Sequence, residues 1–593
     1  MPAARRSPAS PDSNHATLQT VLKPACRLLT REGVVSTKRR ERRVHGAATI
    51  RRSWAAPLTL ALLCAALYGR TVAFGYTRTD DTVQLLDNAS FVASLRNLPE
   101  AFARPFFAAN GAASYYRPVV TLSYMLDAQW SGVDPSGYRL TNVLLHFVAA
   151  ALFFAVSIRL GFQRDHACVA AAILAVHPAL TEAVAWIPGR GDTLLAIWFL
   201  SALLCLMRWL KDGRPLWLVM HGWFVLVALF TKEAAIALPA VFIAFVLLVA
   251  RRPSVLRGPR LWVVWGGAVG IWFVSWRAVI GGSEANSPVK HLAEMAGHLT
   301  VPLMFLGKAM WPTHPAVLAI EQDTSWLPGA VAALLLAVVF WWLRDGDRRL
   351  FAWGVSSFLL LLAPSLAVSD FLILEIRSYA PLVGLLVAVL AVARQLCARW
   401  PSAKTTIVVR AVGVVAVTAL AIRSTTYAAS FRDVEAFTAQ AVATSPHSTL
   451  AHCNRGIALQ LAKRLDEAEA EYQHALALDR TIAVAHNNLG LIELNRARFD
   501  SAEGLFREEL ALNPSYDKAY VNLALALKAS GRIDEAVASL QQAVELNPSN
   551  ADALEGLASY YAFRGDSAAA EQYRGRLRSV RAESGQAGLR TPE

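Results

Sequence analysis

The sequence predicts an all-α protein in which a polytopic helical membrane domain of about 11 spans is followed by a superhelix of short helical repeats. The 593-residue chain is 55% hydrophobic and only 17% charged, with a mean hydropathy of +0.36, so it is too apolar for an ordinary soluble enzyme. Its long apolar runs all lie before about residue 425. Beyond that point the chain is rich in Ala, Glu, Asn and Arg, and its residues recur at a fixed period.

Residues 1–53 contain clusters of arginine and lysine with Ser and Pro, and little apolar periodicity. This composition is typical of a disordered basic tail, which we place in the cytoplasm. The first apolar run follows at Trp54–Phe74 and has no small-residue cleavage site after it. We therefore expect a retained first helix rather than a signal peptide.

Ten further apolar runs of spanning length predict the rest of the membrane region, residues 54–425. They lie at about 140–158, 167–186, 193–209, 215–231, 234–250, 261–280, 326–343, 350–368, 379–396 and 405–423. With a cytoplasmic N-terminus, fifteen Arg and Lys residues fall in five short inner loops, which is the bias that sets orientation. The apolar stretch at 299–311 is then re-entrant or interfacial.

The odd number of spans carries the C-terminal region to the extracytoplasmic side. High Ala and Arg content favours a bacterial inner membrane, with the repeats in the periplasm. In a eukaryotic host the membrane would be that of the endoplasmic reticulum. The formal net charge of +14 is explained mostly by the inner loops and the tail, so no nucleic-acid partner is expected.

Small residues recur every 34 positions in residues 426–580, in a series formed by Gly456, Gly490, Ala524 and Ala558. This is the pattern of tetratricopeptide (TPR) repeats, in which small residues let paired helices pack closely. A disordered tail is expected at 581–593. Three asparagines keep the same period, namely Asn454, Asn488 and Asn522. They are typical either of a solvated helix face or of an amide ladder that binds the backbone of an acceptor polypeptide.

Ionisable residues that are costly near a membrane gather on the predicted outer side. The longest loop, residues 75–139, holds Asp80 and Asp81. Others lie in SYYRP, NVLLH, HPALTEAVAW, PGRGD, TKEAA, GKAMWPTHP and EIRSY. Each one alone is also explained as a helix cap or an interfacial anchor. Together they predict a site for a charged group attached to a lipid.

Several strings resemble the transmembrane-and-TPR protein O-mannosyltransferases and their bacterial relatives. These are FGYTRTDDTVQLLDN, YYRPVVTLSYMLD, GYRLTNVLLH, HPALTEAVAW, GRGDTLLAIWFLSALL and LGKAMWP, in order before the TPR region. The resemblance implies a GT-C glycosyltransferase fold and transfer of a sugar, typically mannose, from a polyprenyl-phosphate to Ser or Thr hydroxyls of proteins. The acidic pair of that family falls on Asp80 and Asp81. Where relatives have an adjacent acidic-Arg pair, this chain has Glu375, Ile376 and Arg377.

Chemical reasoning leads to the same roles. A serine hydroxyl is a poor nucleophile at neutral pH, so a carboxylate must take its proton, and we assign this to Asp80. For Asp81 the sequence leaves three roles open: it could orient Asp80, bind the acceptor or hold a divalent cation. Displacement by such a base would invert the anomer. Cations should stabilise the departing lipid phosphate. We assign donor phosphate and sugar binding to Arg117, His146, His177, Glu182, Arg190, Asp192, Lys232, Lys308 and Arg377.

Two other classes remain open. One is a non-catalytic membrane-anchored TPR scaffold for protein interaction or assembly, although an anchor needs far fewer spans. The other is a transporter or flippase, which inverted repeats with broken helices would favour. No Gly-rich phosphate loop is evident, so an ATP-driven protein is not expected.

Overall fold

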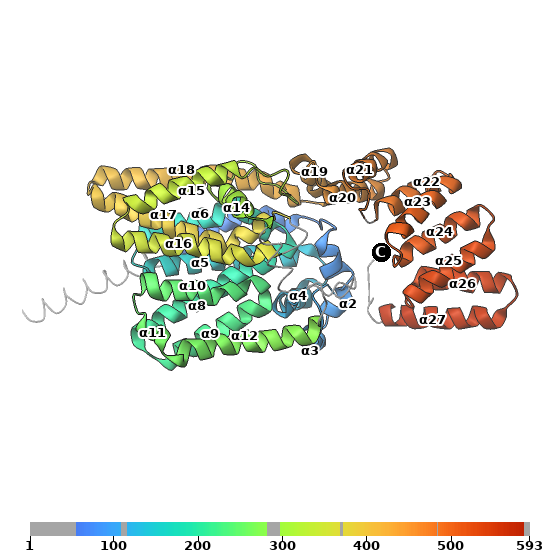
Figure 1. The fold of residues 1–593 in the computed structure, drawn as a ribbon, viewed down its shortest axis with the longest axis horizontal. Helices are drawn as coiled ribbons and strands as arrows, with labels where there is room; N and C mark the ends of the chain where they lie inside the picture. Colours follow the sequence, from blue (N-terminus) through green and yellow to red (C-terminus); the bar gives the residue numbers. More distant parts are fainter. Residues whose placement is uncertain (1–54, 108–114, 282–296, 368–371, 483, 586–593) are drawn as a thin grey trace, which may run out of the picture. The chain divides into compact units, whose positions relative to one another are not determined.

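The computed structural model describes residues 55–107, 115–281, 297–367, 372–482 and 484–585 (Figure 1). Within these ranges the regular elements are helices, and an isolated antiparallel bridge joins Ile320 to Leu372. The predicted all-α class is therefore confirmed. The chain forms two compact units, Met1–Ala61 and Leu62–Glu593, and every contact given below lies within the second. The predicted tail at 1–53 lies outside the described residues.

Helices occupy all eleven stretches that the sequence predicts as spans. Seven helices of the described chain are long and apolar enough to cross a membrane. They are Ala55–Ala73, Pro135–Arg159 (α5), Ile187–Asp212 (with α8, Arg190–Asp212), Pro259–Ile280 (α12), Asp345–Leu366 (with α16, Asp345–Leu362), Glu375–Arg399 (with α17, Tyr379–Arg399) and Ala403–Phe431 (with α18, Ala403–Ala428).

The four other predicted spans differ from this regular form. Arg164–Val176 (α6) and Pro178–Ala185 (α7) are bent by 59° at Pro178 and make an eighth span if counted as one. Proline explains the bend because it lacks the N–H that would continue the helix. Three shorter apolar helices complete the set, at Pro215–Thr231 (α9), Glu233–Val249 (with α10, Leu238–Ala244) and Leu327–Trp342 (α15). The stretch predicted to be re-entrant forms only the ten-residue helix Val301–Met310 (α14).

The segment predicted as the long outer loop, residues 75–139, is largely helical. It contains Thr82–Leu86 (η2), Ala89–Val92 (α2), Leu98–Ala101 (α3) and Pro118–Ser131 (α4). Its apolar side chains form a core in which Phe91, Met125 and Tyr138 are buried. The same core includes Ile187 and Leu194, so this layer packs against the start of α8 and the acidic pair is held on a packed scaffold.

Small residues bring α16 and α17 into close contact. A Cβ added to Gly384 would lie 2.4 Å from the carbonyl oxygen of Gly354, and a Cβ on Gly354 would lie 2.4 Å from that of Gly384. Close backbone approach of this kind is how helices associate in membranes, where apolar surface alone gives no driving force. Since α17 begins just after Glu375, this contact also fixes part of the candidate site.

The C-terminal region consists of paired helices, drawn in brown to red in Figure 1. They are α19 (Val434–Thr444), α20 (Thr449–Leu461), α21 (Leu465–Leu478), α22 (Ala485–Asn495), α23 (Phe499–Leu512), α24 (Asp517–Ala529), α25 (Ile533–Leu546), α26 (Ala551–Phe563) and α27 (Ser567–Gly585). A Cβ on Gly456 would lie 2.5 Å from the ring of Tyr472, and one on Gly490 would lie 2.6 Å from that of Phe506. The 34-residue series thus marks helix contacts that need a small side chain.

We expect Gly384→Ala to destabilise the membrane region by about 1–3 kcal/mol, because the added methyl group overlaps the backbone of α16. Gly270→Ala in α12 is the matched control, since a Cβ there has no atom within 4 Å. The measurement is unfolding of the purified protein in detergent micelles. Equal stabilities of the two variants would contradict the close contact.

Candidate active site

The two adjacent aspartates Asp80 and Asp81 lie in different environments. Asp81 is fully buried, and its Oδ2 accepts hydrogen bonds from the backbone N–H of Thr77 (2.7 Å) and the Thr77 hydroxyl (3.1 Å). Its Oδ1 accepts from the backbone N–H of Thr79 at 2.9 Å. The Thr77 hydroxyl also accepts from Nε1 of Trp186 at 3.0 Å. Asp81 therefore closes the turn that carries Asp80, and its oxygens are already occupied by groups of the chain.

Asp80 is accessible, but nearby parts of the protein displace water from around its carboxyl group. The resulting loss of water raises the pKa of Asp80 to about 6, and the neighbouring Asp81 charge acts in the same direction. The Arg117 guanidinium opposes this shift by favouring the carboxylate. Burial also raises the pKa of Asp81, against the hydrogen bonds from Thr77 and Thr79. An accessible carboxyl group with a pKa near 6 has the properties of a general base.

Arg117, directly before α4, forms an ion pair with Glu233. Its Nε and Nη2 donate to Glu233 Oε2 at 3.0 and 2.9 Å. Glu233 also accepts from the backbone N–H of Tyr116 at 3.2 Å, and the Arg117 guanidinium lies 4.4 Å from the ring centre of Tyr115. A guanidinium held in this way presents its remaining donors in a fixed orientation.

Lys232 and Arg377 extend this positive region. Lys232 Nζ lies 2.5 Å from Oδ2 of the buried Asp192, at the start of α8. Arg377 interacts electrostatically with Asp192, Arg117 and Glu182. The structure therefore brings together five of the predicted donor-binding residues, and one of them, Arg117, interacts electrostatically with Asp80.

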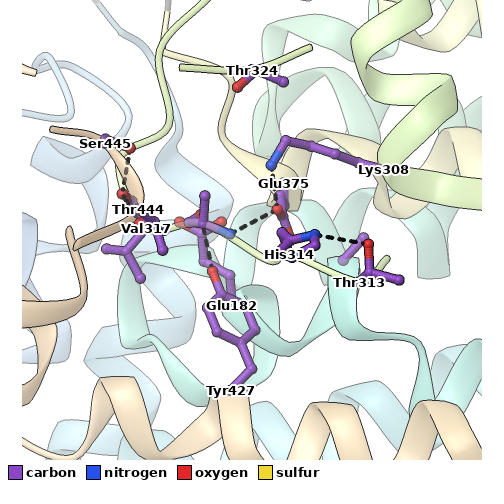
Figure 2. Close-up of polar contacts among 12 residues, drawn as sticks. Glu182, Lys308, Thr313, His314, Val317, Thr324, Glu375, Tyr427, Thr444 and Ser445 are labelled. Atoms are coloured by element: carbon purple, nitrogen blue, oxygen red, sulfur yellow. Dashed lines mark hydrogen bonds and ion pairs between the residues drawn. The ribbon is translucent and has the colours of Figure 1, made fainter. Parts of the chain in front are cut away.

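A second ion pair joins α14 to the start of the Glu375–Arg399 helix, as Figure 2 shows. Lys308 Nζ lies 2.7 Å from Oε1 of the buried Glu375, which also accepts from the backbone N–H of Ala316 at 3.0 Å. The buried Glu182 lies beside this pair and accepts from the backbone N–H of Ile376 at 3.3 Å. Lys308 and Glu182 thus bond to Glu375 and Ile376, the two residues directly before Arg377.

Two predicted histidines make contacts with the chain itself. His146 is buried, with Nδ1 2.5 Å from the hydroxyl of Tyr379 and Nε2 2.9 Å from the carbonyl oxygen of Ala175. His177 accepts from the backbone N–H of Ala179 at 3.2 Å and contacts the carbonyl oxygen of Ala309 at 3.0 Å. These bonds occupy both nitrogens of each ring, so packing alone explains these two residues.

Arg190 is also engaged by the chain. Its Nη2 lies 2.6 Å from Asp127 Oδ2 and 2.7 Å from the carbonyl oxygen of Tyr138, while Nε donates to Asn142 at 2.7 Å. Its side chain is fully buried. Arg190 thus ties α4, α5 and α8 together, beside the cluster formed by Arg117, Lys232 and Arg377.

Arg139 is a buried residue that sequence reasoning missed. Its guanidinium donates to the carbonyl oxygens of Gly75, Ala185 and Phe431, and it interacts electrostatically with Asp81. The sequence signal that could have identified Arg139 is an arginine in GYRLT, directly before a predicted span. A charge at that place needs a partner within the protein.

The predicted asparagines of the repeats lie on α20, α22 and α24. Asn522 Nδ2 donates to Asn487 Oδ1 at 2.8 Å, and Asn487 Nδ2 donates to Asn488 Oδ1 at 3.3 Å. Asn454 is half-buried on α20. A row of amides therefore crosses from one repeat to the next. Asn487, one residue out of phase with the series, was not predicted.

Two family models match parts of this chain. A model described as dolichyl-phosphate-mannose-protein mannosyltransferase matches residues 118–277, and a TPR repeat model matches residues 526–562. The first match begins one residue after Arg117 and includes Arg190, Asp192, Lys232 and Glu233. The matched region thus covers α4 to most of α12 and part of the candidate site, while Asp80, Asp81 and Arg377 lie outside it.

Similar proteins carry a corresponding name. Protein O-mannosyl-transferase Tmtc1 of Drosophila melanogaster is 35% identical over 174 residues, covering 29% of this chain and 20% of that protein. Protein O-mannosyl-transferase tmtc2 of Xenopus laevis is 34% identical over 137 residues, covering 22% and 16%. Protein O-mannosyl-transferase TMTC2 of Homo sapiens is 39% identical over 99 residues, covering 17% and 12%. The alignments thus span a fifth or less of these relatives.

A crystal structure of MamA is 19% identical and covers 25% of this chain and 87% of its own, with a TM-score of 0.23. The chain joins a region similar to dolichyl-phosphate-mannose-protein mannosyltransferases to TPR repeats, which confirms its resemblance to the transmembrane-and-TPR protein O-mannosyltransferases.

Proposed function

We propose that this chain is a membrane glycosyltransferase that moves mannose from a polyprenyl-phosphate donor to Ser or Thr hydroxyls of proteins on the extracytoplasmic side. The observation that carries the proposal is Asp80, an accessible carboxylate in a turn closed by its buried neighbour Asp81 and within the electrostatic influence of Arg117. The names of the similar proteins and the mannosyltransferase match support the same reaction class. TPR repeats support a protein acceptor.

In the proposed reaction Asp80 removes the proton of the acceptor hydroxyl as its oxygen attacks the anomeric carbon of the sugar. The bond between that carbon and the phosphate oxygen breaks, and the lipid phosphate leaves with the electron pair. The hydroxyl oxygen and the phosphate lie on opposite sides of the carbon in such a displacement, so the anomer inverts. Asp81 acts through Asp80 as a positioning residue, because its oxygens already accept hydrogen bonds from Thr77 and Thr79.

Arg117, Lys232 and Arg377 are proposed to stabilise the leaving phosphate. The first two are paired with Glu233 and Asp192, so their charge is balanced before a donor binds. A phosphate would compete with these carboxylates for the donors of the cations, and it gains negative charge as it leaves. Preplaced cations then stabilise the transition state more than the bound donor.

The isoprenoid tail of the donor needs an apolar path beside these cations. A groove of about 630 Å³ lies between α14, α15, α16 and α17, lined by residues such as Leu306, Phe340, Phe358 and Leu385. Leu306 lies on α14 two residues before Lys308, whose ammonium pairs with Glu375. We propose that the tail lies in this groove with its phosphate toward the charged cluster.

We expect Asp80→Asn to reduce transfer by about 10²–10⁴-fold, because the amide cannot accept the hydroxyl proton. The measurement is transfer of radiolabelled mannose from polyprenyl-phosphate-mannose to protein, in membranes with equal amounts of each variant. Asp87→Asn is the matched control, since Asp87 is an exposed aspartate of the same layer. Asp81→Asn should lower both activity and thermal stability, since it disturbs the turn at Thr77.

Two outcomes of this assay overturn the proposal. Unchanged transfer by Asp80→Asn would remove Asp80 as the base. Absence of transfer by the folded wild type from any lipid-linked sugar, with acceptors present, would favour the alternative of a membrane-anchored TPR scaffold.

The rate should depend on pH through Asp80. A base acts only when deprotonated, so the single-turnover rate should fall as the pH drops through about 6. Arg117→Gln removes a charge that lowers the pKa of Asp80, so the acidic limb should move to higher pH. Arg117→Lys keeps the charge and should move the limb less. An unshifted limb in Arg117→Gln would show that another group titrates.

The asparagines at the 34-residue period should act on binding of the acceptor polypeptide and not on the chemical step. We expect Asn454→Ala and Asn522→Ala each to raise the KM for a long unfolded Ser- and Thr-rich polypeptide about fivefold, the cost of roughly one hydrogen bond. The kcat for a short peptide of the same composition should stay constant. Asn495→Ala is the control, because its exposed amide bonds only within its own helix, to Leu491. Equal KM values in all variants would contradict a role of these asparagines in binding and favour the alternative of a solvated helix face.

A further inference from the structure

Two histidines and a glutamate meet in the first complete repeat, away from the candidate active site. His452 lies on α20, and Glu471 and His474 lie on α21. One potential ligand atom from each side chain lies within 4.8 Å of the other two. We propose that these three residues form a binding site for a divalent transition-metal ion of the zinc class. The proposal does not depend on sugar transfer.

The orientation of His452 is that of a metal-ligating histidine. Its ring is buried, and Nε2 lies 3.0 Å from the carbonyl oxygen of Pro446, which leaves Nδ1 directed at Glu471 Oε2, 2.6 Å away. Ligating histidines usually donate their other ring N–H to a carbonyl or carboxylate in this way. The contact to Pro446 therefore fixes which nitrogen would bind the ion.

The other two groups can complete the site with little movement. Glu471 and His474 are three residues apart on α21 and so share one face of the helix. The rings of His452 and His474 are 5.5 Å apart, nearly perpendicular. Zinc binds His and Glu at about 2.0–2.2 Å, so its ligand atoms lie roughly 3.5 Å apart. Because His474 is exposed, its ring can rotate to close the remaining distance.

Three protein ligands of this kind suit zinc, cobalt or nickel better than calcium or magnesium, which prefer oxygen. They leave one coordination position open to solvent. The exposed His474 also gives the ion a route of entry. Such an ion would join α20 to α21 and, through Pro446, hold the segment that follows α19.

The next repeat shows that TPR packing does not require this set. Thirty-four residues after His452, His486 lies 3.5 Å from Glu508, which takes the place of His474. Leu505 takes the place of Glu471 and packs in the apolar core. This repeat has two ligand groups where the preceding one has three. It provides a matched internal control.

The test uses the full chain in detergent, purified with a tag free of histidine and treated with a chelator. Zn²⁺ binding is followed by calorimetry and Co²⁺ binding by visible absorption. We expect one tight site, a cobalt spectrum of low coordination number, and a rise in thermal stability with Zn²⁺. His474→Ala should weaken binding roughly 100-fold or more, since loss of an outer partner alone costs about 10–100-fold. Glu471→Gln should also weaken it, while His486→Ala should bind as the wild type does.

His474→Ala removes an exposed side chain, so folding is retained and the comparison is direct. Equal affinity of wild type and His474→Ala for Co²⁺, or no cobalt spectrum in the wild type, would leave His452 and Glu471 as an ordinary ion pair and overturn the proposal. Loss of the site in His486→Ala alone would move it to the next repeat and overturn it as well.

Discussion

The guanidinium of Arg139 lies in an environment where an unpaired charge would cost several kcal/mol. It is held by carbonyl oxygens from three distant segments, at Gly75, Ala185 and Phe431, and by the field of Asp81. If one of these carbonyl groups moved away, the buried guanidinium would lose a hydrogen-bond partner. The turn that carries Asp80, the end of α7 and the end of the Ala403–Phe431 helix are therefore fixed relative to one another by one side chain.

The same constraint explains the form of the candidate site. Cations near a membrane need counter-charges, and here these come from other elements: Glu233 for Arg117, Asp192 for Lys232 and Glu375 for Lys308. Each of these three cations is therefore balanced by a carboxylate of the chain itself. Asp80 differs from these carboxylates because it is accessible and its neighbour Asp81 takes the structural bonds.

Periodicity and composition made much of the fold predictable. The 34-residue series identifies the repeats because each Gly or Ala marks a helix contact, and the apolar runs identify the membrane helices. Partners such as Glu233, 116 residues from Arg117, and Asp127, on a different helix from Arg190, were not predictable, since they meet only after the helices pack. The Asp80 and Asp81 pair was visible, but the division of their roles depends on the turn at Thr77. The helical layer at 75–139 was missed because η2, α2 and α3 have only four or five residues each and show no clear apolar period.

The strap formed by residues 313–324 connects the charged cluster with the first helix of the C-terminal region. Glu375 accepts from the backbone N–H of Ala316, whose carbonyl oxygen accepts from the Tyr427 hydroxyl at 3.1 Å (Figure 2). The next residue, Val317, donates to the hydroxyl of Thr444 at the end of α19. The backbone of this strap thus bonds to the pair formed by Lys308 and Glu375 on one side and to α18 and α19 on the other. A displacement of α19 would strain the bonds of Val317 and Ala316, so the register of the repeats and the geometry around Glu375 are set by the same few backbone groups.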